Sequence, residues 1–221
     1  MIGLIIKDFI NLKRNIKVLG FIILIYGISS YIMKDASYFG SIFTLVFGLL
    51  MLTTYGYDEY AKWDNYALTL PINRNDIILA KYMVLLLLTF VGAVINILFT
   101  GLMSAIQNTH MDTNMLRDAL IAAGLGFALV ILFYSIVLPF ITKFGIEKAR
   151  IICILIYGIF FGIYMFFRNI IQEGNSPAAE KLIQVLEIVR ENVYIILPVL
   201  VIIAVVISYM VSANIYRKKE F

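Results

Sequence analysis

The chain has 221 residues, of which 62% are hydrophobic and only 14% are charged. A soluble globular domain carries about 45–50% apolar and about 25% charged residues, so this composition excludes an ordinary soluble domain and indicates an integral membrane protein embedded in a lipid bilayer. The net charge of +4 arises from basic residues that flank the apolar stretches, and it therefore does not indicate a nucleic-acid partner.

Residues 1–17 are predicted to form an amphipathic helix and not a membrane span. The apolar residues recur at three- and four-residue spacing on one face, which consists of Ile2, Ile5, Phe9, Leu12 and Ile16. Such a helix lies in the plane of the membrane interface. Three basic residues near its end would meet anionic headgroups at the cytoplasmic surface: Lys13, Arg14 and Lys17. A simple anchor and a docking site for a partner both fit this pattern.

Six stretches are apolar enough to be interpreted as membrane spans, each of which needs roughly 20 mostly apolar residues. They are Val18–Met33, Phe39–Gly56, Tyr82–Ile106, Ala119–Thr142, Ile151–Phe167 and Val193–Tyr216. The first is short, but Lys17 and Lys34 flank it and can reach the two interfaces. Long uncharged runs do not fit a β-barrel, whose strands would be about 10 residues long with alternating polarity. We therefore predict an all-α integral membrane protein with one transmembrane domain over residues 1–221.

The distribution of basic residues predicts how the chain is oriented. With six spans, both termini share a side with the segments 57–81 and 143–150, and this side carries 13 of the 18 Lys and Arg residues. Because cytoplasmic loops are enriched in Lys and Arg, we expect this face and both termini to be cytoplasmic in the cell membrane. On the opposite face, residues 176–192 show a helical apolar stripe and predict an extracellular amphipathic helix.

Residues 57–81 form a dense polar segment between the second and third spans. Its first part is predicted to be a helix with an apolar face made by Tyr57, Tyr60, Trp63 and Ala67. Asp58 and Lys62 stand four residues apart and are expected to form an ion pair on another face of this helix.

A break and a new helix follow in the same segment. Pro71 ends the first helix because the residue before a proline disfavours helical geometry. Asn73 is then a suitable N-cap, and Asp76 at the third helical position favours the positive end of the helix dipole. We expect the new helix to continue into the third span, which would leave a stiff elbow with an exposed polar corner.

Motifs for catalysis are missing from the chain. It has no G-x-x-x-x-G-K-[ST] loop for phosphates and neither H-E-x-x-H nor G-x-S-x-G, so we expect no enzyme activity and no cofactor or metal bound by this chain. Polar residues within the spans provide no nucleophile with a base beside it: Thr53, Thr54, Asn96, Ser104 and Ser135. Gly158 and Gly162 form a small-xxx-small face that predicts a close helix contact, within the chain or between subunits.

The segment after the second span carries a resemblance to a known family. The order Tyr57-Asp58-Glu59, Lys62-Trp63-Asp64, Leu70 to Ile77 and Lys81-Tyr82, together with the six spans and the N-terminal helix, resembles the permease subunits of ABC-2 type exporters. The similarity is greatest to the small bacterial permeases that export phenol-soluble modulins or antimicrobial peptides. It covers the whole chain in architecture and residues 57–82 in sequence.

The resemblance implies partners and a site. A separate ABC ATPase subunit would bind ATP and Mg²⁺, and two permeases, identical or related, would assemble with two ATPases. The coupling surface for the ATPase would consist of Asp58, Glu59, Lys62, Trp63, Asp64, Leu70, Pro71, Asn73, Arg74 and Asp76. The second and fifth spans would line a cavity for a hydrophobic or amphipathic substrate, with contacts from Phe43, Phe47, Thr53, Phe160 and Tyr164, although simple helix packing explains each of these residues as well.

Other functions remain compatible with the sequence. A substrate-binding membrane subunit of a vitamin importer has a similar size and number of spans. A membrane immunity or sensor protein would sequester a membrane-active peptide without an ATPase. An ABC ATPase encoded beside this chain would favour the exporter, whereas a solitary gene would favour the immunity protein.

Overall fold

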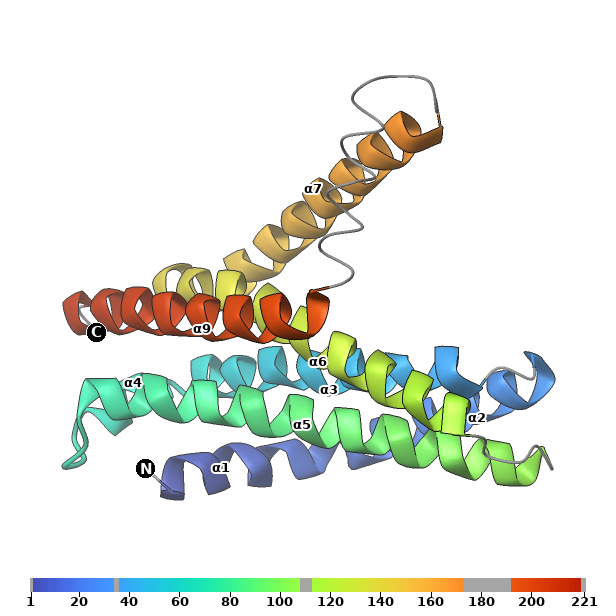
Figure 1. The fold of residues 1–221 in the computed structure, drawn as a ribbon. Helices are drawn as coiled ribbons and strands as arrows, with labels where there is room; N and C mark the ends of the chain where they lie inside the picture. Colours follow the sequence, from blue (N-terminus) through green and yellow to red (C-terminus); the bar gives the residue numbers. More distant parts are fainter. Residues whose placement is uncertain (1, 34–35, 108–112, 173–191, 220–221) are drawn as a thin grey trace.

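The computed structural model describes residues 2–33, 36–107, 113–172 and 192–219 (Figure 1). These residues form helices and turns, with no strand among them, so the predicted all-α class is confirmed. The helices are α1 (Ile2–Leu12), the 3₁₀ turn η1 (Lys13–Asn15), α2 (Ile16–Met33), α3 (Ala36–Tyr60), α4 (Trp63–Ala67), α5 (Arg74–Ile106), α6 (Thr113–Phe144), α7 (Ile146–Gln172) and α9 (Val193–Lys218). The segment predicted as an extracellular helix, 176–192, falls almost wholly outside the described residues.

The N-terminal helix continues almost directly into the first predicted span. Leu12 and Ile16, which flank η1, both keep right-handed helical dihedral angles, and α1 runs beside α5 in Figure 1 and packs against α3 and α5. Most of the predicted apolar face of α1 is packed, because Leu12 is buried and Ile5 and Phe9 pack against the core, whereas Ile2 and Ile16 at its two ends are exposed. Packing against α3 and α5 therefore uses the predicted stripe, and it also buries Asp8.

The core of the molecule lies between α3, α5 and α6, with α9 packed on α5 and α6. Gly92 makes this possible, because a Cβ atom there would lie 2.9 Å from the Cβ of Phe47 and 3.0 Å from the Cα of Thr44. The largest buried side chains on these helices include Met51, Leu85 and Tyr134. A small residue at the contact lets two helix backbones approach closely, as is usual for helices in membranes.

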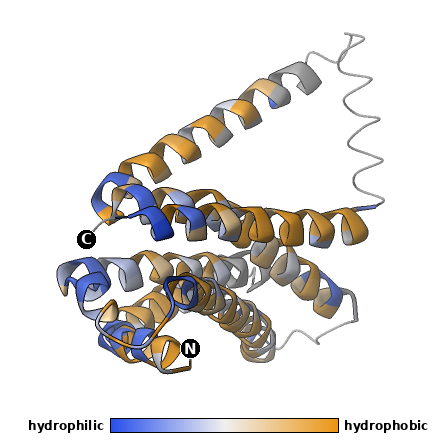
Figure 2. Ribbon diagram, turned by 90° about the vertical axis from the view of Figure 1, so that its left-hand side faces the viewer, coloured by the Kyte–Doolittle hydropathy of each residue, from blue (hydrophilic) through white to orange (hydrophobic). Residues whose placement is uncertain are grey.

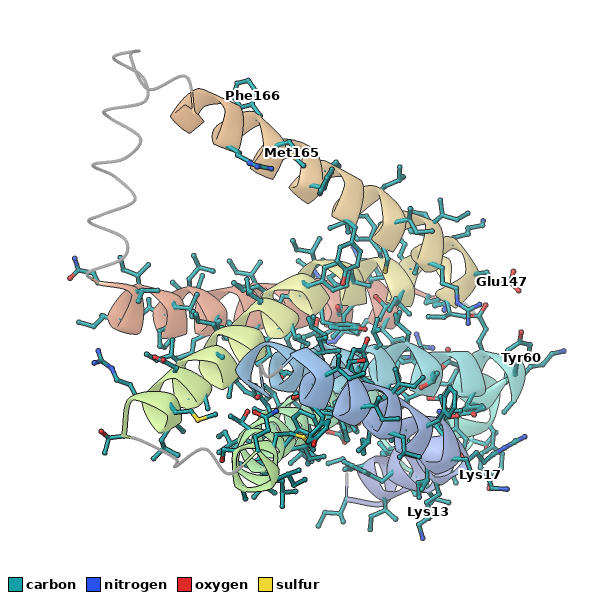
Figure 3. All side chains as sticks on the ribbon, turned by 90° about the vertical axis from the view of Figure 1, so that its right-hand side faces the viewer. Lys13, Lys17, Tyr60, Glu147, Met165 and Phe166 are labelled. Carbon is teal, nitrogen blue, oxygen red and sulfur yellow. The ribbon has the colours of Figure 1, made fainter. Side chains whose placement is uncertain are left out.

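Helix α7 leaves the bundle after its first two turns. Ala149 and Cys153 are buried, whereas Ile154, Ile159 and many of the later side chains are exposed, and Figure 1 shows α7 diverging from the other helices. Near its far end, Met165 and Phe166 stand apart from the bundle in Figure 3. The helix is thus held near its first turns while the rest of its length offers an apolar surface.

Hydropathy marks two zones along the bundle. Figure 2 shows hydrophobic residues along the helix shafts and hydrophilic residues gathered where α1 begins and α9 ends. Four helical stretches of the described residues are long and apolar enough to cross a membrane: Ile2–Ile32, Arg74–Ile106, Met115–Phe144 and Ile195–Lys218. The chain is therefore a multi-pass membrane protein, and its polar end carries the segment 57–81.

Candidate functional site

The polar segment folds as a corner of two helices joined by a turn. Helix α3 ends at Tyr60, and Lys62 adopts a left-handed backbone conformation with φ of 48° before α4 begins at Trp63. This break separates the residues of the predicted apolar face, so that Tyr60 is exposed while Ala67 is fully buried. The prediction of one continuous helix that carries Tyr57, Tyr60, Trp63 and Ala67 on one face is therefore wrong.

The start of α5 agrees with its predicted signals. Asn73 is the N-cap with an extended backbone, and Asp76 is the third residue of the helix that begins at Arg74. The N-cap works here through the backbone, because the carbonyl of Asn73 accepts hydrogen bonds from the N–H groups of Asp76 and Ile77 at 2.9 and 3.4 Å. The start of α5 is thus as expected, whereas α4 ends at Ala67, four residues before Pro71.

Four charged side chains meet where α1, α3 and α5 come together, and we refer to Lys7, Asp8, Asp58 and Lys81 as the charge cluster. Lys81 Nζ lies 2.9 Å from Asp8 Oδ2 and 2.5 Å from Asp58 Oδ2. Lys7 Nζ lies 2.6 Å from Asp58 Oδ1 and 3.2 Å from Asp8 Oδ1. The predicted ion pair between Asp58 and Lys62 is therefore wrong, since both oxygens of Asp58 pair with lysines of other helices.

The charge cluster is deeply buried and electrically balanced. The side chains of Asp8 and Lys81 are 2% and 6% exposed, and aromatic rings cover the two ammonium groups. Lys7 lies 4.2 Å from the ring centroid of Trp63, and Lys81 lies 4.9 Å from that of Tyr55. Two cations and two anions with reciprocal contacts offset the cost of removing them from water, which an unpaired charge could not do. The cluster therefore fixes α1 to the ends of α3 and α5.

A second link joins the corner to α7. Glu59 Oε2 accepts a hydrogen bond of 2.6 Å from the backbone N–H of Ile146, the first residue of α7. A carboxylate at this position satisfies a free N–H group and favours the positive end of the helix dipole. The preceding residue, Gly145, has φ of 81°, and a Cβ atom there would lie 3.0 Å from Glu59. The turn between α6 and α7 is thus shaped to receive this side chain.

A third link joins the corner to the end of α9. Tyr216 donates a hydrogen bond of 3.0 Å to Asp64 Oδ1. Arg74 Nη1 donates to the backbone carbonyls of Arg217 at 2.7 Å and Lys219 at 3.1 Å, and it lies 3.4 Å from that of Tyr216. A guanidinium group here satisfies carbonyls that a helix C-terminus leaves unpaired.

The predicted coupling residues therefore fall into three groups. One group contacts other helices of the same chain: Asp58, Glu59, Trp63, Asp64 and Arg74. Leu70 and Asp76 form the second group and are half-buried, and the remaining residues are exposed. The outward surface, which we call the exposed corner, consists of Tyr60, Lys62, Tyr66, Pro71 and Asn73. Tyr60 and the exposed Glu147 of α7 lie at the same end of the molecule in Figure 3, so the start of α7 extends this surface.

The structure describes the side chains of three of the five predicted cavity residues. Phe43 is buried and packs edge-on against Phe99 with ring centroids 4.8 Å apart, and Phe47 packs against the core. Thr53 donates its hydroxyl hydrogen to the carbonyl of Leu50. The side chains of Phe160 and Tyr164 lie outside the described residues. A substrate contact for these five residues remains a prediction.

Sequence reasoning missed the charge cluster. Its residues come from three segments, and helical periodicity relates only residues of one helix. One signal is present in α1, because Asp8 stands four residues before Leu12 and so lies on the same face as an apolar residue of the stripe. An acid at such a position indicates a buried basic partner, but the sequence alone does not distinguish Lys81 from the other basic residues near the spans.

A family model described as "ABC-2 family transporter protein" matches residues 3–217. The chain belongs to the ABC-2 transporter family. Membership implies a membrane environment and an ABC ATPase as partner in general, which agrees with the apolar helices and the polar corner. No curated protein and no solved structure matches the chain.

Proposed function

We propose that this ABC-2 transporter is the permease subunit of an exporter, in which a second permease and two separate ATPase subunits complete the assembly. Six helices would cross the membrane, namely α2, α3, α5, α6, α7 and α9, with α1 at the cytoplasmic interface. The start of α1 and the end of α9 lie at one end of the bundle (Figure 1). The excess of Lys and Arg at this end supports a cytoplasmic location.

The observation that carries the proposal is the construction of the corner. Its inner side chains are tied to α1 by the charge cluster, to α7 through Glu59 and to α9 through Arg74, while its outer side chains face solvent. ATP-driven motion in a partner shifts a membrane bundle only through contacts that differ between the two states. A corner that is fixed to three helices and open on its other side is suited to transmit such a motion. ATP and Mg²⁺ would be held by the ATPase, and this chain would carry no catalytic residue.

A second permease is supported by the open face of α7. A Cβ atom placed on Gly158 or Gly162 would meet no atom within 4 Å, so these small residues have no helix against them within the described part of the chain. Close helix contacts in membranes use such small residues. We therefore assign this face to a contact between subunits, either two copies of this chain or two related chains.

An amphipathic peptide is the proposed substrate. This choice rests on the resemblance of residues 57–82 to the permeases of peptide exporters, which is an argument by analogy. Exposed apolar side chains along α7 and α9, such as Ile159 and Ile203, provide surfaces that an amphipathic helix can contact without burying unpaired polar groups.

The proposal is tested by co-purification with the ABC ATPase encoded beside this chain. Lys62→Glu combined with Tyr66→Ala alters only exposed side chains of the corner, so we expect the permease to fold normally and to lose the ATPase. Arg117→Glu serves as the control, because Arg117 is exposed at the start of α6, at the other end of the bundle. Equal recovery of the ATPase with the unmodified permease, the double variant and the Arg117→Glu control would overturn the coupling assignment. Tight binding of an amphipathic peptide with no ATPase partner would instead favour the immunity protein.

A further inference from the structure

Helix α9 is joined to the corner and to the start of α5 by more polar contacts than join α7 to the corner. Besides the bonds from Arg74, Arg217 Nε donates a hydrogen bond of 2.8 Å to Asn75 Oδ1 at the start of α5. Tyr82, two turns along α5, has its hydroxyl 2.5 Å from the hydroxyl of Ser208 and 2.9 Å from that of Ser212. Its ring also packs edge-on against Tyr209 with centroids 5.8 Å apart.

These contacts follow one line along two antiparallel helices. Ser208 and Ser212 are four residues apart and therefore lie on one face of α9, and Tyr216 continues that face by one more turn. All three are buried, and so is Tyr82. Hydrogen bonds between buried side chains have fixed partners because water does not compete for them. The cytoplasmic halves of α5 and α9 are thus connected at three successive levels.

Helix α7 provides the contrast within the same chain. Among the described residues, the polar contact between the corner and α7 is the hydrogen bond from Ile146 to Glu59. Beyond Cys153, side chains such as Leu155 and Ile159 are exposed, while the ring of Tyr157 still packs against that of Phe133 in α6. A displacement of the corner would therefore reach α9 through a rigid connection and reach α7 only through its first turn.

We propose that Arg74 is a positioning residue that locks α9 to the corner, so that α9 moves as one body with α5 when the ATPase acts. The inference rests on the proposed coupling function, but it changes the role of Arg74 from an ATPase contact to an internal connection. The guanidinium group is suited to this role because its Nη1 approaches three carbonyls of the same helix end, and a cation there favours the negative end of the helix dipole.

The experiment measures distances between spin labels in the full-length protein. In a Cys153→Ser background, labels on Met83→Cys and Ile203→Cys report the start of α5, beside the corner, relative to α9. Labels on Met83→Cys and Ile159→Cys report the start of α5 relative to α7. All three labelled positions are exposed. In the reconstituted complex with the ATPase, ATP and Mg²⁺ should leave the first distance unchanged and shift the second.

Two variants test the role of Arg74 directly. Arg74→Met keeps the apolar stem of the side chain and removes its hydrogen-bond donors. The distribution of distances between the first pair of labels should therefore broaden even without the ATPase. In the complex, ATPase binding should stay unchanged while permease-stimulated hydrolysis falls about tenfold, because loss of charged hydrogen bonds weakens the connection. Arg74→Lys should partly restore both the narrow distance distribution and the permease-stimulated hydrolysis. If Arg74→Met does not fold, Tyr82→Phe should give the same broadening to a smaller degree, because it removes only the hydroxyl contacts.

The outcomes separate this inference from the proposed function. A narrow distance distribution in Arg74→Met would refute the proposed locking role of Arg74, whether or not the ATPase binds. Loss of ATPase binding in Arg74→Met with a narrow distribution would return Arg74 to the ATPase contact surface. A broad distribution in a permease that binds no ATPase would keep the lock and refute the exporter.

Discussion

Replacement of Lys81 by methionine tests whether the charge cluster holds the cytoplasmic end together. Methionine preserves most of the apolar stem but removes the contacts to Asp8 and Asp58, whose distances are 2.9 and 2.5 Å. The cluster would then carry two carboxylates and one lysine, with Asp8 only 2% exposed. Removal of one partner from a buried ion pair costs about 3–5 kcal/mol. This corresponds to a hundredfold or larger shift in the unfolding equilibrium.

The assay is reversible unfolding of the purified protein in mixed micelles, followed by circular dichroism. Lys7→Met should cost less than Lys81→Met, because the side chain of Lys7 is 21% exposed and that of Lys81 is 6% exposed. Lys62→Met is the matched control, and we expect it to change stability by less than about 0.5 kcal/mol since Lys62 is exposed. The double variant Asp8→Asn with Lys81→Met should recover part of the loss. Equal stabilities of Lys81→Met and Lys62→Met would refute the reasoning.

Four further substitutions, one of them a control, test packing and backbone conformation by the same unfolding assay. Gly92→Ala should destabilise by about 1–3 kcal/mol because its Cβ atom would meet α3 at 2.9 Å, whereas Gly124→Ala, with no atom within 4 Å of its Cβ, should stabilise slightly; the reverse order would contradict the helix contact. Asn96→Leu should stabilise by about 1–3 kcal/mol, because both amide atoms of Asn96 are buried and form no hydrogen bond with the residues that the structure describes. A loss of stability would show that the amide has a partner. Lys62→Gly should stabilise by about 0.5–1 kcal/mol since φ is 48° there, and a destabilised variant would argue against the left-handed turn.

The fold was largely predictable because hydrophobic length is a strong signal. Each of the six predicted stretches lies within or nearly within a helix of the structure, and the start of α5 at Arg74 follows from the signals of Asn73 and Asp76. The helices extend beyond the apolar runs, as α5 and α6 show with 33 and 32 residues. Apolar composition predicts the part of each helix that would lie in lipid, and the helical hydrogen bonds of the backbone continue beyond that part.

The site was less predictable because its contacts join distant segments. Arg74 and the end of α9 are more than 140 positions apart, and Lys7 and Asp58 are 51 positions apart. Local periodicity contains no information about such pairs. It also does not predict the left-handed backbone of Lys62, because lysine is usually a good helix former. The turn into α4 decides the conformation of this residue. The segment 57–81 was identified, but which of its residues face inward had to come from the structure.

Transport in proteoliposomes tests the central claim most directly, that a separate ATPase drives this permease through its exposed corner. The measured quantity is accumulation of a fluorescently labelled amphipathic peptide, with and without the neighbouring ATPase and ATP with Mg²⁺, for the unmodified chain and for the variant with Lys62→Glu and Tyr66→Ala. The account predicts accumulation only when the ATPase, ATP and an intact corner are all present. The same accumulation without nucleotide, or with the altered corner, would contradict it.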